Sequence, residues 1–327
     1  LLLVAIGLSL DPAGVAGLRF PPLGTLEMPA RLSFLAFGAL SVLMGLLALT
    51  RPTASRFHGW ALGFLGFEII VLILVWSTID GRTDVVGMMQ QSLRLATPIA
   101  LGALAGVMCE RAGVVNIAIE GMMLTAAATS AVIASVTRSL WVGLLASLIM
   151  AGLLGLLLAV LSIRFKVNQV ISGTAINILA TGATSYVSAR YLQVYQHLNR
   201  PGKFPNLPVP LLARLPVLGP IFFETNVLVY LMLVLLVSIH VMLYYTRWGL
   251  RTRAIGEHPH AAATVGVDVN RMRYINVVLG GMVAGLGGAF LVLGSVPRFD
   301  ELMTAGKGFI GLAALIFGKW TPFGSFG

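Results

Sequence analysis

The chain has 327 residues, of which 57% are hydrophobic and 10% charged, and its mean hydropathy is +0.92. An ordinary soluble domain carries roughly a quarter charged residues, so too few polar side chains are present to cover a water-soluble globule. The net charge of +10 does not indicate nucleic acid, because Lys and Arg are scattered in short loops between apolar runs.

Motifs for cofactor, metal or covalent chemistry are missing from the sequence. Cys109 is the single cysteine, which excludes an internal disulfide and a cysteine-rich metal site. Residues 305–309 (AGKGF) contain a Gly-Lys pair but have Gly308 where a nucleotide-binding loop needs Ser or Thr. We therefore expect no cofactor, no metal and no catalytic residue, and any ATP that drives this protein is bound by another chain.

Apolar segments long enough to cross a membrane recur along the whole chain. About 20 residues cross a hydrocarbon core of about 30 Å as a helix, so the sequence predicts an all-α polytopic membrane protein. Both ends look truncated, and residues 1–10 predict a partial helix that brings the total to about ten. The predicted spans are 32–50, 60–79, 88–108, 116–136, 140–163, 168–193, 226–246, 274–296 and 308–327.

Basic residues predict how the chain is oriented, because short loops rich in Lys and Arg stay in the cytoplasm. The other set of alternate loops, including a Pro-rich connection over 194–225, is predicted to lie outside. The residues predicted inside are Arg51, Arg56, Arg111, Arg164, Lys166, Arg247, Arg251, Arg253, Arg271, Arg273 and Lys319, and those outside are Arg82, Arg138 and Arg298.

Small residues are dense in the helix that contains GGMVAGLGGAF (280–290). Gly281 with Gly285, and Ala284 with Gly288, have the small-xxx-small spacing that lets two backbones approach closely. We interpret these glycines as packing residues that carry no information on a solute.

Glu120 and Asn116 lie near the start of the predicted span 116–136. A carboxylate at the centre of a bilayer costs at least ~2.5 kcal/mol on insertion scales, so Glu120 should face protein or water. It either lines a solute pathway or sits within the headgroups and caps the start of its own helix. The sequence leaves both interpretations open.

A polar stripe follows the predicted span 168–193, where Thr174, Asn177, Thr181 and Thr184 are spaced by three or four residues. Such a stripe either bonds to neighbouring helices or lines an aqueous path. Asn177 is the best candidate for a solute contact, because an amide both donates and accepts. Glu68, in the middle of an apolar N-terminal helix, is expected to pair within the bundle.

The connection 247–274 contains a short helix signal of its own. Pro259 suits a first helical turn, the run HAAATV favours a helix, and Gly266 suits the position just past its end. The segment is too short and polar to span a membrane. It is either an amphipathic surface helix or a helix that docks into a soluble partner.

Four blocks in order carry a resemblance to a known family: RAGVVNIAIEGMML (111–124), VNQVISGTAINILA (167–180), LRTRAIGEHPHAAATVGV (250–267) and MTAGKGFIGLAALIFGKWTPFG (303–324). The chain resembles permease subunits of bacterial ABC importers in the branched-chain amino acid, ribose and nucleoside group. It is most similar to the nucleoside or simple-sugar type. The resemblance covers roughly 88–327 and leaves 1–87 as an N-terminal transmembrane extension.

This resemblance implies a type II-like importer bundle in a bacterial cytoplasmic membrane. The implied partners are a second permease, identical or paralogous, two cytoplasmic ATP-binding subunits and an external substrate-binding protein. Residues 254–267 become the coupling helix within a cytoplasmic loop 247–273. The implied pathway residues are Asn116, Glu120, Thr174, Asn177 and Thr181, and the coupling residues are Arg253, Gly256, Glu257, Pro259, Ala262 and Gly266.

One internal likeness supports the importer reading independently. NIAIEGMMLTAA (116–127) and TAGKGFIGLAAL (304–315) share a polar start, a charge-Gly pair and an apolar continuation, as an inverted repeat would. An ion-driven secondary transporter with intramembrane carboxylates is the rival, and a branched-chain amino acid permease of the same family is a second alternative. A membrane enzyme would need converging acid, base or metal residues, which the sequence lacks.

Overall fold

The computed structural model describes residues 2–11, 13–21, 23–50 and 56–327, so the predicted position of Arg51 lies outside the described residues. Contacts between Cα atoms divide the chain into two compact units. Unit 1 comprises residues 1–91 and 209–224, and unit 2 comprises residues 92–208 and 225–327.

Within the described residues, eight helices are long and apolar enough to cross a membrane. They match the first eight predicted spans, which confirms a polytopic helical protein. Three of them, over 140–159, 169–187 and 269–289, continue into a π-helical segment, over 160–164, 188–192 and 290–295 respectively. The helices are α2 (Ala30–Leu49), α3 (Arg56–Ser77), α4 (Val85–Glu110), α5 (Ile119–Thr137), α6 (Leu140–Ala159), α7 (Gln169–Val187), α9 (Val227–Tyr245) and α12 (Val269–Ala289).

The ninth predicted span, 308–327, is wrong as a single helix. The chain forms α13 (Lys307–Phe317), turns, and then forms the short α14 (Pro322–Phe326). Lys319 and Trp320 have positive φ values of 52° and 54°, and Thr321 caps α14 by accepting the Gly324 N–H. A left-handed turn followed by Pro at the first helical position ends one helix and begins another.

Unit 1 contains a feature that the sequence reasoning missed, a small sheet beside the helices α1 (Leu2–Ser9), α2 and α3. Strand β1 (Val15–Phe20) pairs antiparallel with β2 (Gly24–Pro29) and parallel with β3 (Arg82–Asp84). Glu68 of α3 is buried and accepts a hydrogen bond from Ser41 of α2, the expected pairing between helices. Helix α8 (Leu218–Phe223) also belongs to this unit.

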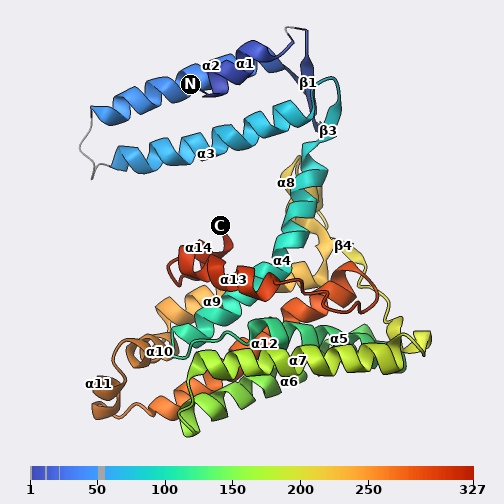
Figure 1. Cartoon of the computed structure of the whole chain (residues 1–327), viewed down its shortest axis with the longest axis vertical. Helices are drawn as coiled ribbons and strands as arrows, with labels where there is room; N and C mark the ends of the chain where they lie inside the picture. Colours follow the sequence, from blue (N-terminus) through green and yellow to red (C-terminus); the bar gives the residue numbers. More distant parts are fainter. Residues whose placement is uncertain (1, 12, 22, 51–55) are drawn as a thin grey trace. The chain divides into compact units, whose positions relative to one another are not determined.

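The core of unit 2 is a bundle in which α5, α6, α7 and α12 lie side by side (Figure 1). Glycines of α12 face its neighbours so closely that a side chain would collide with backbone. A Cβ atom at Gly281 would lie 2.7 Å from the Ala151 carbonyl oxygen, and one at Gly288 would lie 2.0 Å from that of Met123. The predicted packing role of these glycines is confirmed.

In unit 2, loops that the basic residues predict to lie on the same side of the membrane contact one another. At one end of the bundle Arg111 donates to the backbone oxygen of Lys319. At the other end the backbone N–H of Arg200 donates to Ser135, close to the Arg138 turn. The assignment of the first end to the cytoplasm stays a prediction.

Candidate functional site

The site is built around the segment that joins α4 to α5, residues 110–121. Gly113 turns the chain with a φ of +78°, which glycine adopts without strain. Asn116 is fully buried, and its side-chain oxygen accepts the N–H of Ala118 at 3.1 Å. Its amide nitrogen contacts the sulfur of Cys109. Asn116 therefore shapes the start of α5 from inside the fold and faces no open path within this chain.

Glu120, in the first turn of α5, is half-buried and caps a different helix. Its two carboxylate oxygens accept the backbone N–H groups of Gly306 and Gly308 at 2.8 and 2.7 Å, at the start of α13. A Cβ atom at Gly308 would lie 2.7 Å from the Glu120 backbone, so only glycine permits this approach. The capping interpretation is therefore correct in kind, although the capped helix is α13.

This contact brings the two similar segments together. Glu120 and Gly121 in the first segment occupy the same motif position as Lys307 and Gly308 in the second. The two segments touch at these charge-Gly pairs. Their relation as an inverted repeat stays a prediction.

Asn177 braces α7 against the start of α5. Its amide nitrogen donates to the Ile117 carbonyl oxygen at 2.9 Å, and its oxygen accepts the Gly121 N–H at 2.8 Å. Both ends of the amide are thus bonded to backbone at the site. A contact between Asn177 and a solute stays a prediction.

The threonines of the stripe have different surroundings. Thr174 is exposed and bonds to its own helix, Thr181 is half-buried, and Thr184 is buried. Thr184 lines a mainly apolar groove of about 240 Å³ between α5 and α7. A pathway role for Thr174 and Thr181 stays a prediction.

Arg111 and Glu110 hold the far end of α13, and sequence reasoning missed both as site residues. The Arg111 guanidinium donates to the backbone oxygens of Trp320 and Lys319 at 2.9 and 3.3 Å, and to the Tyr244 hydroxyl at 3.3 Å. Glu110 accepts the indole N–H of Trp320. Residues 110–121 therefore form hydrogen bonds at both ends of α13. Glu120 bonds to its start, and Glu110 and Arg111 bond to the turn just past its end.

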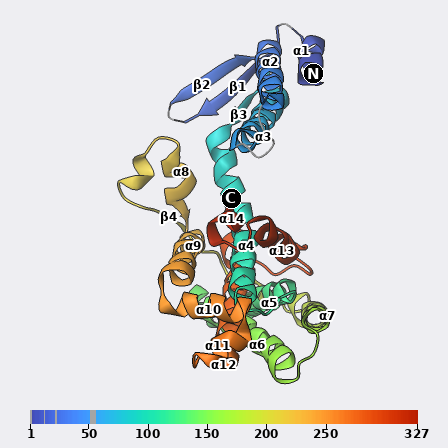
Figure 2. The same cartoon turned by 90° about the vertical axis from the view of Figure 1, so that its left-hand side faces the viewer.

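The predicted coupling helix 254–267 is wrong as a single helix. Residues 254–257 are the last turn of α10 (Arg247–Glu257), and after His258 the chain forms α11 (Pro259–Thr264); α10 and α11 lie together in Figure 2. Pro259 opens α11, and Gly266 follows it with a φ of +80°. The short helix signal is therefore confirmed. Ala262 is buried in a cluster with Ala112, Ile255 and Met272, so its side chain anchors α11 to this chain.

Other coupling residues divide between internal anchors and exposed groups. Glu257 is exposed, and Val265 just past α11 is 78% exposed. The guanidinium of Arg253 lies 5.0 Å from the centre of the Tyr244 ring, a cation–π contact. Arg253 thus links α10 to α9, whereas the side chains of Glu257 and Val265 are exposed.

Gly256 is where α10 meets the central segment. A Cβ atom there would lie 2.3 Å from the Arg111 carbonyl oxygen. Beside this contact, Arg273 of α12 donates from Nε to the Ala112 oxygen at 3.1 Å. Residues 110–121 therefore contact α10 and α12 on one side and α13 and α7 on the other.

The residues missed by sequence reasoning left only weak signals. Arg111 and Arg273 counted as orientation charges, and their bonds to backbone oxygens depend on tertiary structure. Gln169 accepts the Val115 N–H at 2.7 Å, yet a single Gln at a helix start has no distinctive spacing. Only the block RAGVVN, as part of the resemblance, pointed to the Arg111 region.

Comparison with known proteins agrees with this architecture. Residues 88–326 match the family model described as branched-chain amino acid transport system / permease component. The guanosine ABC transporter permease protein NupQ of Bacillus subtilis is 40% identical over 72% of this chain and 76% of its own length. The nucleoside ABC transporter permease protein NupC of Lactococcus lactis is 35% identical over 70% and 74%.

An archaeal relative is similar to the same degree. The putative glucose ABC transporter permease protein TsgC13 of Haloferax volcanii is 35% identical over 72% of this chain and 71% of its own length. No solved structure gives a significant match. The family model, these relatives and the eight apolar helices agree: the chain is a multi-pass membrane protein that belongs to the family of branched-chain amino acid transport system permease components.

Proposed function

We propose that this chain is the membrane-spanning subunit of an ATP-driven importer that moves a nucleoside or simple sugar inward by alternating access. The substrate class is supported by relatives named for guanosine, nucleosides and glucose. A second permease, two ATP-binding subunits and an external binding protein complete the assembly. Hydrolysis of ATP takes place in the partner chains.

One observation carries the mechanism: residues 110–121 touch the coupling helices and both ends of α13. ATP-driven closure of the partner subunits would push on the exposed surface of Glu257 and Val265. The close contact of Gly256 with Arg111 passes this push to residues 110–121. Because Glu120 and Arg111 hold α13, the helix moves with this segment and changes the access of the pathway.

The energy source distinguishes this proposal from the rival. The chain is reconstituted in proteoliposomes with its ATPase and binding protein, and uptake of labelled guanosine and glucose is measured with and without ATP. We expect uptake to require ATP and all partners. Uptake by the chain alone under a proton or sodium gradient would establish a secondary transporter, and leucine uptake in preference to both probes would establish an amino acid permease.

Glu257→Arg tests the coupling surface in the same assembly. Because Glu257 is exposed beside α11, the change should leave folding intact and weaken the contact with the ATPase. ATP hydrolysis should continue while uptake falls at least roughly tenfold, the equivalent of about 1.4 kcal/mol. Normal ATP-dependent uptake by this variant would show that the segment does not couple.

A further inference from the structure

A second polar site lies at the end of unit 2 that is predicted to face outside. The π-helical end of α7, the short helix Gln196–Asn199 and residues 297–301 enclose a pocket of about 570 Å³. This volume lies within the range of small-molecule sites. None of the pathway residues Asn116, Glu120 and Asn177 lines this pocket. Its polar lining residues are Ser188, Gln193, Gln196, Asn199, Arg200, Arg298, Asp300 and Glu301.

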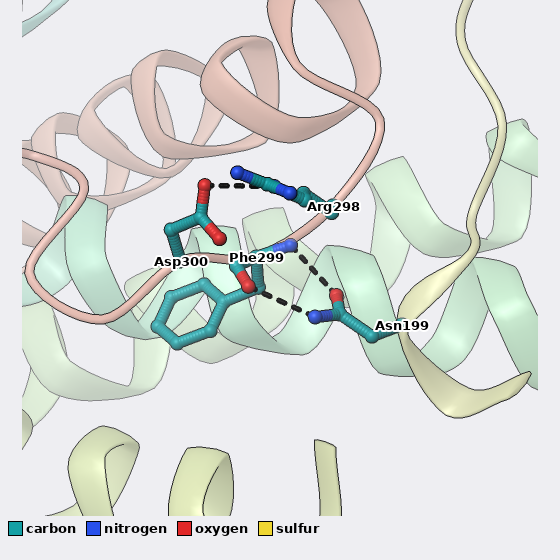
Figure 3. A network of polar contacts seen from close by, with 4 residues as sticks. All are labelled: Asn199, Arg298, Phe299 and Asp300. Carbon is teal, nitrogen blue, oxygen red and sulfur yellow. Dashed lines mark hydrogen bonds and ion pairs between the residues drawn. The ribbon is translucent and has the colours of Figure 1, made fainter. Parts of the chain in front are cut away.

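Two hydrogen bonds from one side chain fix one wall of this pocket, which we call the outer pocket. The Asn199 amide nitrogen donates to the Phe299 carbonyl oxygen at 2.9 Å, and its oxygen accepts the Phe299 N–H at 2.7 Å (Figure 3). The Phe299 side chain is buried, which fixes the same residue from its other side. The backbone of this wall is thus fixed before a ligand binds.

Charges in the outer pocket balance one another. Arg298 and Asp300 form an ion pair at 2.9 Å, visible in Figure 3, and Arg200 and Glu301 add one charge of each sign. The remaining polar groups include the amides of Gln193 and Gln196, which donate and accept hydrogen bonds. Such a lining suits a neutral solute with hydroxyl groups or base edges and does not favour an ion of either sign.

The outer pocket also adjoins the start of α13. Immediately after Glu301 the chain passes through Leu302 and Ala305, both with positive φ, to Gly306. The N–H of Gly306 is bonded to Glu120. One wall of the pocket is therefore part of the same segment that ends on the α13 cap.

We propose that this outer pocket is the first binding site in the permease for the uncharged polar solute, occupied before the solute reaches the level of Glu120. This proposal rests on the importer function and adds its receiving site. The binding protein would release solute into the pocket. Movement of α13 would then open the way inward.

Cysteine protection tests the outer pocket directly. Natural Cys109 is buried, so Gln193→Cys supplies the reactive thiol of the chain. The assembly of permease and ATPase is placed in proteoliposomes, and labelling by a small polar maleimide is timed with guanosine, glucose, sodium phosphate or the solute-free binding protein; the binding protein is also added wherever uptake is measured. At ten times the Kd about one site in eleven is free, so guanosine or glucose should slow labelling about tenfold. Phosphate should not.

Thr137→Cys is the matched control, because Thr137 is exposed at the same end and outside the pocket. Its labelling should be unaffected by any probe. Glu301→Cys, on another lining segment of the pocket, should repeat the protection and guards against a defect peculiar to Gln193→Cys. Without protection of either cysteine by guanosine or glucose, the solute site is refuted. Protection by the binding protein but not by solute would show that the pocket is a docking surface for that protein, and would also refute the solute site.

ATP-dependent uptake by each unlabelled cysteine variant is measured in parallel. If a variant takes up solute but solute does not protect its cysteine, the receiving site is refuted and the importer function is not affected. Loss of ATP-dependent uptake in the unmodified chain as well would remove the importer function itself. The two failures are therefore distinguishable.

Discussion

Single polar side chains in this permease hold helix ends together by bonding to backbone. Glu120 satisfies two N–H groups that begin α13, and Asn177 satisfies one N–H and one carbonyl at the start of α5. The first N–H groups of a helix have no partner within the helix, and in a membrane they find no water. These residues therefore stabilise the contacts between α5, α7 and α13, through which the proposed conformational change would be transmitted.

Glu120→Gln should loosen α13. The substituted amide retains one oxygen, so one of the two N–H groups loses its acceptor and a charge-assisted bond becomes neutral. We expect a loss of about 1–3 kcal/mol in stability and a lower rate of uptake. Thermal unfolding in detergent measures the first effect and the reconstituted assembly the second. The exposed Glu27→Gln serves as control, and equal unfolding temperatures for both variants would contradict the capping role.

Asn177→Ala should destabilise the chain as well as slow uptake. It removes two hydrogen bonds between α7 and α5 and leaves a partly buried carbonyl and N–H unpaired, a cost of about 1–3 kcal/mol. Thr174→Ala, one turn earlier and exposed, should change stability by less than about 0.5 kcal/mol. Unchanged unfolding of Asn177→Ala with reduced uptake would make Asn177 a solute contact and not a brace.

At the level of elements, the short helix α13 is fixed by its neighbours. Its 11 residues span only about 16 Å, roughly half of a hydrocarbon core of about 30 Å. The helix is therefore too short to cross a membrane alone, and Glu120 caps its start. Because residues 110–121 contact both ends of α13, we expect a displacement of α10 to move α13 as a rigid body.

Gly256→Ala tests that transmission. The added methyl group would collide with the Arg111 carbonyl oxygen and push α10 away from residues 110–121. ATP hydrolysis by the assembly should persist while uptake falls at least roughly tenfold. In α7, Gly182→Ala meets nothing within 4 Å and should be neutral or stabilising by about 0.5–1 kcal/mol. Equal uptake by the two variants would refute the contact as a transmission point.

Sequence reasoning predicted the long helices well because a membrane demands length and apolar composition, which are local properties. The break between α13 and α14 was missed, although Thr321 and Pro322 are a local signal for a new helix start. The sheet of β1, β2 and β3 was missed because its strands are short and β3 lies far along the chain. The roles of Arg111 and Gly256 depend on tertiary contacts that no spacing records.

For the whole molecule, the two ends of unit 2 differ in the residues they gather. Arg111, Arg253, Arg273 and Lys319 belong to the end that carries α10 and α11, whereas Arg200 and Arg298 belong to the end that carries the outer pocket. The concentration of basic residues at the first end predicts that it faces the cytoplasm. This orientation underlies both proposals.

Cysteine labelling in membrane vesicles measures the orientation. An impermeant maleimide should label Val265→Cys in inside-out vesicles and Thr137→Cys in right-side-out vesicles. Both positions are exposed, and the wild-type chain with its buried Cys109 gives the background. The reverse pattern would place the coupling helices outside and exclude contact with a cytoplasmic ATPase.

The cap on α13 also has an electrical consequence. Glu120 places a charge at the start of α13, where both of its carboxylate oxygens accept backbone N–H groups. Moving one elementary charge across a membrane changes the free energy by about 2.3 kcal/mol per 100 mV. Because the proposed cycle moves Glu120 together with α13, the membrane voltage should bias the rate of uptake by a fraction of this energy.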